Sequence, residues 1–466
     1  MPQAQTTTAP KRLPLVTAPS NRDNDPTKDA RLVNCYAEKA LDGDYWIYKR
    51  PGLLTDSTPP GSASAGLGIF RWLGNTYSIF GSTVYKNGVA LAGSVDTTNG
   101  VYRFSSCLGT QLLVFGNGVK AYTCDGTTVT VISDPNFPAS FVKGWAYLDG
   151  TMYVMNTTAH VLGSAINNPT SWDPLNTITA QIEPDLAVGL EKQLVYVVAF
   201  KQWTTEIFYD QQNVPPSSPL GPVQGAKLDY GCISADSIRI LDGTLFWLST
   251  NRTGSAQVMA LNNLKVDVIS TPAIERLLDD SSYVTIYSWT HKDEGHKFYI
   301  LTLVNLNLTL AYDIGQQLWS QWTDVNGNYL PIVDSCTDAV FEHLVQHATD
   351  GKLYKFDTEY FGDDYSIITA DIITPNFDGG IDRRKTLSRM HVAADQTPGS
   401  VLKVRYNDND YDPVKWSNFR DIDLSRERPF LQDMGTFSRR AFHFRHQSNT
   451  RLRIKAVDLQ LDIGTL

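Results

Sequence analysis

Two histidines four residues apart are the first feature whose spacing could support chemistry. His343 and His347 have the spacing of histidines on a zinc-binding helix, but Glu342 precedes the first histidine, whereas that motif places its glutamate after it. The segment alternates polar and apolar residues like a strand, which would hold the two side chains about 13 Å apart, too far for one zinc ion. The sequence therefore predicts a strand here and no metal site.

Three alternating aspartates, Asp408, Asp410 and Asp412, have the spacing that opens a calcium-binding loop. Such a loop needs glycine at its sixth position and glutamate at its twelfth, where this sequence has Pro413 and Phe419. The stretch also resembles the Asp-box turn of sialidase propellers, but it lacks the glycine of that turn and does not recur. We predict a surface turn. A two-carboxylate hydrolase stays open as an alternative, because its acids could lie on any pair of loops.

Other catalytic motifs are missing from the sequence. It has no Gly-x-Ser-x-Gly elbow, no phosphate-binding loop and no dinucleotide-binding fingerprint. The five cysteines are far apart, and no pair has the spacing of metal ligands. This pattern is typical of small buried side chains in a protein made in a reducing compartment. We therefore predict a protein that is not an enzyme, with no catalytic residue, no metal and no cofactor.

The unit that recurs along the chain is a tight turn followed by an apolar or aromatic run. In its clearest copy, residues 241–249, the turn dipeptide Asp242-Gly243 stands between two strand-like segments and predicts a β-hairpin. Related copies begin near residues 73, 108, 148, 191, 294 and 349. Their spacing, roughly 35 to 55 residues, is typical of a four-stranded propeller blade.

These units predict an all-β fold, a β-propeller of about six or seven blades plus a small C-terminal antiparallel β-sandwich. A pair of ordinary β-sandwiches with similar turns is the alternative. The predicted domains are an N-terminal arm (1–30), N-terminal strands and a linker (31–65), the propeller (66–380) and the C-terminal sandwich (381–466). We expect a strand at residues 45–48 to complete the last blade and close the ring.

One short helix and the charge distribution complete the predicted organisation. Thr271 and Pro272 are good first residues for a helix over 271–278. The 466 residues include 40 basic and 49 acidic ones, a net charge of −9, which argues against general nucleic-acid binding. Residues 382–466 alone hold 16 basic and 11 acidic residues, so this end is either a partner-binding surface or a solvated face. No window is long and apolar enough to span a membrane.

Several stretches resemble the packaged-DNA stabilisation proteins of short-tailed bacteriophages, also called tail hub or nozzle proteins. The resemblance covers scattered blocks in most of residues 31–357, and their shared order is its most specific feature. The blocks are 33–38 (VNCYAE), 50–53 (RPGL), 205–210 (TEIFYD), 231–234 (GCIS), 246–248 (FWL), 269–275 (ISTPAIE), 295–299 (GHKFY) and 309–313 (TLAYD), the last followed by Trp319.

The resemblance implies a structural role in the virion tail, after assembly in the cytoplasm of the host bacterium. Proteins of this family form a ring, typically of six copies, below the portal and adaptor proteins. The ring extends the DNA channel, retains packaged double-stranded DNA without sequence-specific binding, and anchors tail spikes or fibres. An acidic channel wall would repel phosphates and let DNA slide. A carbohydrate-binding or carbohydrate-hydrolysing propeller and a cytosolic scaffold are the alternatives.

Some residues in the resembling blocks are polar, and we expect structural roles for them. Glu206 and Glu275 are expected near strand or helix ends, and His296 is expected to be a polar residue of a hairpin turn. The strand tryptophans are expected in the core; these are Trp247, Trp289, Trp319 and Trp322.

Overall fold

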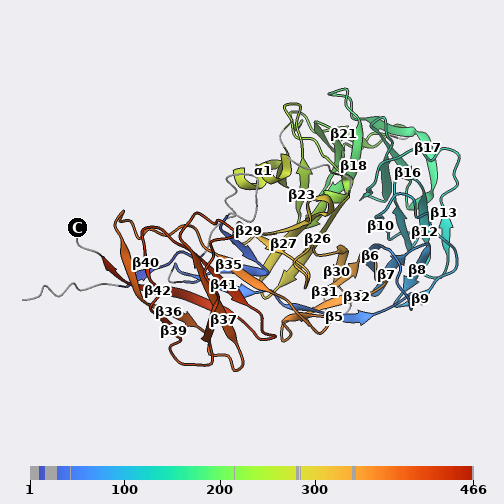
Figure 1. Cartoon of the computed structure of the whole chain (residues 1–466). Coiled ribbons are helices and arrows are strands. Elements are labelled where there is room, and N and C mark those ends of the chain that lie inside the picture. The colour runs from blue at the N-terminus through green and yellow to red at the C-terminus, as the bar shows by residue number, and fades with distance from the viewer. Residues whose placement is uncertain are drawn as a thin grey trace, which may run out of the picture.

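The computed structural model of the protein consists of a ring of small antiparallel sheets and a two-sheet module (Figure 1). The structure describes residues 10–15, 29–41, 43–214, 216–254, 256–279, 283, 285–337 and 343–463. Apart from one α-helix and short 3-10 turns, the regular structure of these residues consists of β-strands. The predicted all-β class is therefore confirmed.

The described residues form seven four-stranded units, which are the blades of a β-propeller. First strands of neighbouring blades contact one another, and the turn η2 (Ala235–Ser237) connects blades four and five, so the first strands lie innermost. In chain order the blades are β6 (Gly66–Trp72), β7 (Asn75–Phe80), β8 (Thr83–Lys86) and β9 (Val89–Ala90); β10 (Arg103–Cys107), β11 (Leu112–Gly116), β12 (Ala121–Cys124) and β13 (Val129–Val131); β14 (Ala146–Leu148), β15 (Thr151–Met155), β16 (His160–Ala165) and β17 (Asn168–Thr179); β18 (Ala187–Gln193), β19 (Tyr196–Lys201), β20 (Thr205–Asp210) and β21 (Leu220–Pro222); β22 (Arg239–Leu241), β23 (Thr244–Ser249), β24 (Gln257–Asn262) and β25 (Lys265–Val268); β26 (Ile286–Asp293), β27 (His296–Leu303), β28 (Leu308–Asp313) and β29 (Leu318–Trp322); and β30 (Ile332–Thr337), β31 (His343–His347), β32 (Leu353–Asp357) and β5 (Gly52–Ser57).

The recurring turn dipeptide makes the inner hairpins as predicted. Asp242 and Gly243 have φ angles of +50° and +78°, a conformation that glycine adopts at little cost and that suits a two-residue hairpin. The same pair of positive φ angles occurs at 73–74, 149–150 and 294–295. The strand after each turn is mostly buried, and Trp247, Trp289, Trp319 and Trp322 are all core residues, as predicted.

A strand from the N-terminal part closes the ring, but it is not the predicted one. β5 pairs antiparallel with β32 as the fourth strand of blade seven, with Leu53 opposite Phe356. The prediction for residues 45–48 is wrong, because β4 (Tyr45–Lys49) pairs with β3 (Cys35–Lys39) and β42 (Arg453–Ile463) outside the ring. Both strands have the aromatic and branched residues that suit a sheet, so composition does not distinguish them.

Close backbone packing at the ring closure leaves no room for a side chain on Gly52. A Cβ atom added there would lie 2.0 Å from the carbonyl oxygen of Gly362. We therefore expect Gly52→Ala to lower the free energy of unfolding by about 1–3 kcal/mol, the usual cost of overpacking. Urea denaturation will measure this change. Gly315→Ala is the matched control, because its nearest neighbour would be 3.4 Å away; an equal loss of stability in both variants would contradict the prediction.

The two-sheet module combines strands from both ends of the chain. One sheet has the order β3, β4, β42, β36 (Lys385–Ala394) and β39 (Phe430–Gln432), with β1 (Lys11–Arg12) on β42 and β40 (Thr436–Phe437) on β36. The other continues blade six through β2 (Arg31–Val33), β35 (Ala370–Ile373), β41 (Ala441–His446), β37 (Val401–Asn407) and β38 (Arg420–Asp423). Side chains from both sheets share one hydrophobic core. Because the second sheet includes the strands of blade six, the module is a continuation of the ring.

Three small elements complete the description. The predicted helix is present as α1 (Pro272–Asp279), and the backbone amide of Ile274 hydrogen-bonds the Thr271 hydroxyl at 3.4 Å. A short hairpin, β33 (Gly362–Asp363) and β34 (Ser366–Ile367), lies beside β5, and the turn η3 (Val304–Leu306) precedes β28. No helix among the described residues is both long enough and apolar enough to cross a membrane.

Candidate functional site at the junction of ring and module

The residues with possible catalytic spacing are engaged in local contacts. His343 and His347 lie at the two ends of strand β31, as the alternation predicts, and the His347 ring accepts hydrogen bonds from the amides of the following turn. In the stretch after β37, Asp408 pairs with Arg440 at 2.7 Å and Asp410 pairs with Arg439. Among the residues that the structure describes, no three His, Cys, Asp or Glu side chains are grouped to hold a metal ion.

The strongest polar constellation lies where blade six meets the two-sheet module. Arg50 is fully buried and forms a bidentate ion pair with Asp363, at 3.1 and 2.6 Å. Its Nε donates to the Asn34 side chain at 3.0 Å, and its Nη2 also donates to the carbonyl of Thr323, at the end of blade six, at 3.0 Å. The guanidinium lies 5.9 Å from the ring centre of Trp322. One side chain thus connects the module strands, blade six and the hairpin beside β5.

Asn34 completes this junction. Its side-chain amide donates to the Thr323 hydroxyl at 2.7 Å and to the Thr369 carbonyl at 2.8 Å, and its oxygen also accepts from the Thr323 amide. The residue has a φ of +52°, a region that asparagine tolerates better than most residues. Asn34 and Arg50 come from two separate blocks of the sequence resemblance, and the structure brings them together. Their partners, Asp363 and Thr369, lie outside those blocks.

A buried histidine–aspartate pair lies in blade six, facing the same N-terminal strands. The Nδ1 atom of His296 is 2.5 Å from a carboxylate oxygen of Asp313, and both side chains are at least nine-tenths buried. The His296 ring packs edge-on against Tyr36 of β3, with ring centres 4.7 Å apart. The prediction of a polar turn residue is wrong: His296 begins β27, because the turn ends one residue earlier at Gly295 and Asp313 provides a partner across the sheet.

The His296–Asp313 pair predicts a pH dependence of stability. Burial lowers the pKa of His296, but the hydrogen bond and charge of Asp313 outweigh it and raise the pKa above its ordinary value of 6.5. A raised folded-state pKa adds stability that is fully present below pH 6.5 and is lost as pH rises through the folded-state pKa. We expect the urea midpoint of the wild type, relative to His296→Gln, to fall on going from pH 6 towards pH 9. His160→Gln is the control, and equal pH slopes in wild type and His296→Gln would contradict the prediction.

The glutamates of the resembling blocks lie at two separate places in the ring. Glu206 accepts from the ammonium of Lys201 at 2.7 Å, and Asp185 binds the same fully buried ammonium at 2.9 Å. Lys201 also donates to the backbone carbonyl of Glu183 at 2.7 Å, which ties the connection between blades three and four to β19. Glu275 on α1 accepts from the Ser270 hydroxyl at 2.9 Å. Both glutamates therefore accept hydrogen bonds from neighbouring side chains.

A hydrogen bond and two ion pairs connect the blades across the propeller axis. Arg103 on the first strand of blade two donates to the carbonyl of Ala235, just before blade five, at 2.7 Å. Lys143 before blade three binds Asp236 at 2.8 Å. A third contact, 3.0 Å long, joins Arg239 of blade five to Asp334 of blade seven. Blades two and five lie on opposite sides of a seven-bladed ring, so these contacts close its centre at this level.

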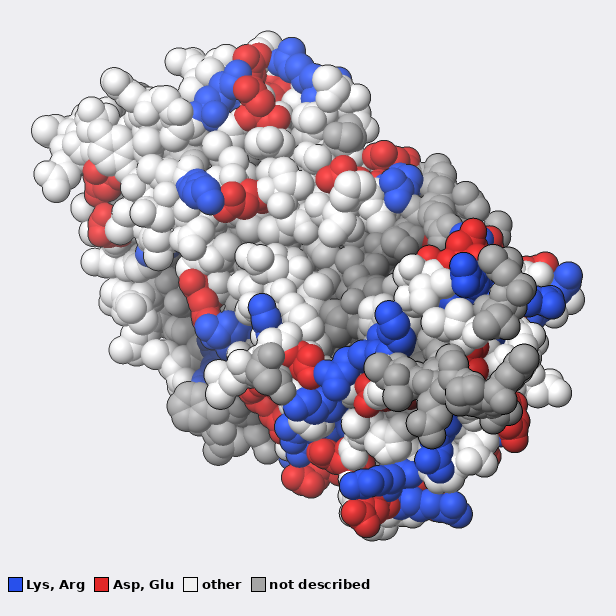
Figure 2. Space-filling model, turned by 90° about the vertical axis from the view of Figure 1, so that its left-hand side faces the viewer, with Lys and Arg blue, Asp and Glu red and all other residues white. Residues whose placement is uncertain are grey.

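Charged residues of both signs cover the end of the molecule that carries the module. Figure 2 shows this end, where most of the blue side chains of this view lie in its lower half, close to red ones. The exposed arginines of the module are Arg12, Arg383, Arg384, Arg389, Arg420, Arg426, Arg428, Arg439 and Arg451. Four of them pair with carboxylates: Arg12 with Asp44, Arg426 with Asp423, Arg439 with Asp410 and Arg451 with Glu294. The face is therefore of mixed charge.

Comparison with known proteins identifies one sequence family and many remote structures. The family described as "Bacteriophage P22 Gp10, beta-propeller" matches residues 27–359. No curated protein matches the sequence. The WD40 β-propeller domain of Doa1 shares 13% identity at a TM-score of 0.39, covering 67% of this chain and 97% of its own. YCF48 from Cyanidioschyzon merolae shares 12% at 0.41, covering 66% and 98%. BamB from Moraxella catarrhalis shares 11% at 0.39, covering 66% and 97%.

Proposed function

The chain belongs to the family of the bacteriophage P22 Gp10 β-propeller protein and has a structural role in a phage tail, and from this premise we propose its place in that tail. Six copies form a ring below the portal and adaptor proteins. The ring extends the DNA channel, retains the packaged genome and anchors tail spikes or fibres. It is built in the cytoplasm of the host bacterium and carries out no catalysis.

The observation that carries this proposal is the extent of the family match. Residues 27–359 include all seven blades and the strands β2 to β5 that join the ring to the module. The match therefore includes Asn34 and Arg50 as well as the blades, but not their partners Asp363 and Thr369. A buried polar junction of this kind fixes the module relative to the ring, because a change in their orientation would leave charged groups unpaired and out of water. Such rigidity suits a part that transmits load between a connector and tail appendages.

The closed propeller axis supports a particular path for the DNA. The contacts from Arg103 to Ala235 and from Arg239 to Asp334 leave no room for a duplex within one propeller. In the proposed ring, DNA therefore passes between the copies and along their outer surfaces. The net charge of −9 favours a wall to which phosphates do not adhere, so that the genome can leave during ejection.

Assembly with the connector tests the proposal. The purified chain is analysed by native mass spectrometry alone and after mixing with the portal and adaptor proteins of the same phage. We expect a closed oligomer that binds the portal–adaptor complex. If the chain stays monomeric and does not bind the portal–adaptor complex, the proposal is overturned. A parallel glycan-hydrolysis screen addresses the carbohydrate alternative, for which we expect no turnover.

A further inference from the structure

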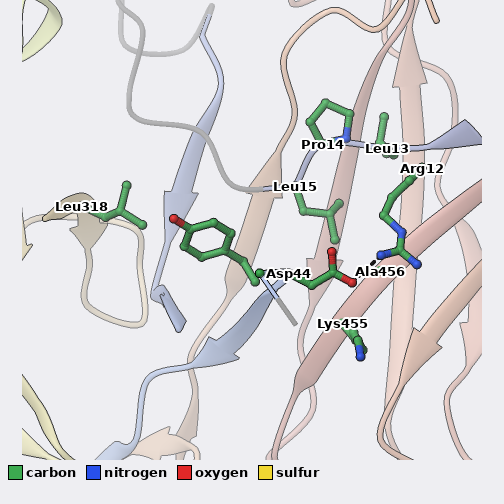
Figure 3. A pocket seen from close by; sticks show the side chains of 10 residues that line it. Arg12, Leu13, Pro14, Leu15, Asp44, Leu318, Lys455 and Ala456 are labelled. Atoms are coloured by element: carbon green, nitrogen blue, oxygen red, sulfur yellow. Dashed lines mark hydrogen bonds and ion pairs between the residues drawn. The ribbon is translucent and has the colours of Figure 1, made fainter. Parts of the chain in front are cut away.

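An N-terminal arm, residues 10–15, occupies a seat on the edge of strand β42 (Figure 3). Its strand β1 (Lys11–Arg12) pairs antiparallel with β42, with Arg12 opposite Asp458. The amide of Leu13 extends this pairing by donating to the carbonyl of Val457 at 2.9 Å. The arm therefore adds a short strand to the first sheet of the module.

The seat holds the arm by apolar and charged contacts together. Leu13 and Leu15 are only 2% and 6% exposed, and both belong to the core of the module. Arg12 forms ion pairs with Asp44 and with Asp458, the latter at 3.4 Å. Pro14, which has no amide hydrogen, ends the ladder between the two leucines. The seat thus recognises an extended segment with one arginine followed by two leucines that flank a proline.

A cavity of about 450 Å³ lies beside the seated arm. Leu15 and Leu318 of blade six line it, as Figure 3 shows, and Tyr45 also belongs to its lining. The arm forms one wall of this cavity, so it does not fill its seat completely.

The arm is joined to its own body only through residues 16–28. Thirteen residues span at most about 45 Å when extended, and this length limits how far an arm can reach from its own body. The arm's partners, Asp44 and residues 457–459, are all distant in the sequence. Nothing in these contacts requires the arm and the seat to belong to the same chain.

We propose that in the assembled ring each arm leaves its own seat and docks on the seat of the next copy. The partner of this surface is thus a second copy of the chain, presenting residues 10–15. The inference rests on the proposed function, because it needs a ring. Exchange of an identical element costs little, since the same contacts form in either arrangement. The exchange links the copies around the ring. Because neighbouring copies are held close together, each arm has a high effective concentration at the seat of the next copy.

Cross-linking of the full chain tests the exchange. The double variant R12C/D458C places two cysteines at directly opposed positions of β1 and β42. Ring-sized material is isolated by native mass spectrometry or gel filtration, oxidised, and run on a denaturing gel without reductant. We expect the band to shift from the monomer to covalent dimers and larger multiples. The single variants R12C and D458C are the controls, and the native cysteines are buried or nearly so.

The outcomes separate this inference from the proposed function. If the double variant forms rings but runs on the gel only as an internally cross-linked monomer, the exchange is overturned and the proposed function is not. A chain that forms no ring overturns the proposed function and the exchange with it. If R12C/D458C does not fold, the pair R12C/D44C reports on the same seat, since Arg12 also contacts Asp44.

Discussion

Replacing Arg50 by methionine is expected to lower the free energy of unfolding by about 3–5 kcal/mol, the usual cost of removing one partner of a buried ion pair. Methionine keeps much of the volume of the side chain but provides no donor. Asp363 then loses both of its guanidinium contacts, and Asn34 and the Thr323 carbonyl each lose a hydrogen bond. Chemical denaturation followed by tryptophan fluorescence measures the change, since Trp322 lies next to the guanidinium.

Arg451 provides the matched control for Arg50. It also joins the module to blade six, through Glu294 at 3.1 Å, but its side chain is 47% exposed. Exposed ion pairs contribute about 0–1 kcal/mol, so Arg451→Met should change stability little. The double variant R50M/D363L removes both buried charges and should recover part of the loss. If R50M is no less stable than R451M, the buried junction does not hold ring and module together.

Replacing Lys201 by methionine should have an effect of similar size, about 3–5 kcal/mol, at a different place. Lys201 is fully buried, and its ammonium binds both Asp185 and Glu206. Its removal leaves two carboxylates buried without a compensating charge. Protonation of a carboxylate relieves such repulsion, so the destabilisation should be smaller at pH 5 than at pH 7. Thermal and urea unfolding at the two pH values measure both effects.

The control for Lys201 is Lys265, whose side chain is 77% exposed and pairs with Asp267. Lys265→Met should change stability by less than about 1 kcal/mol at either pH. A K201M variant as stable as K265M, or one whose defect grows at pH 5, would contradict the assignment. Glu206 lies in one of the blocks that resemble the tail-protein family. The expected loss of stability in K201M would therefore also explain why that block contains a glutamate.

Local features of the sequence predicted the hairpins, but the pairing of strands that are distant in the sequence could not be predicted. Asp242-Gly243 and its copies determine backbone geometry within a few residues, so the turns and the propeller class could be read directly. The strand that closes the ring could not be identified from the sequence. Tyr45–Lys49 and Gly52–Ser57 have equally suitable residues, and only their distant partners distinguish them. Two strands of similar composition could fill one place, and the packing of the whole chain determines which of them does.

The candidate site shows the same division. The sequence resemblance drew attention to the blocks that hold Asn34, Arg50 and His296, but not to their roles. His296 was predicted in a turn because it follows Glu294-Gly295, whereas its burial depends on Asp313 in the next strand and on Tyr36 from the N-terminal part. Asp363 lies outside every block, so no local signal marked it as the partner of Arg50.

The path of DNA relative to the propeller tests the central claim most directly. Cryo-electron microscopy of the intact tail, with the packaged genome present, shows both in one map. The account predicts a ring of copies with DNA density at the centre of the ring, and no DNA density along the axis of any propeller, where Arg103 and Arg239 make their cross-axis contacts. DNA threaded through a propeller, or a tail channel that lacks this chain, would contradict it.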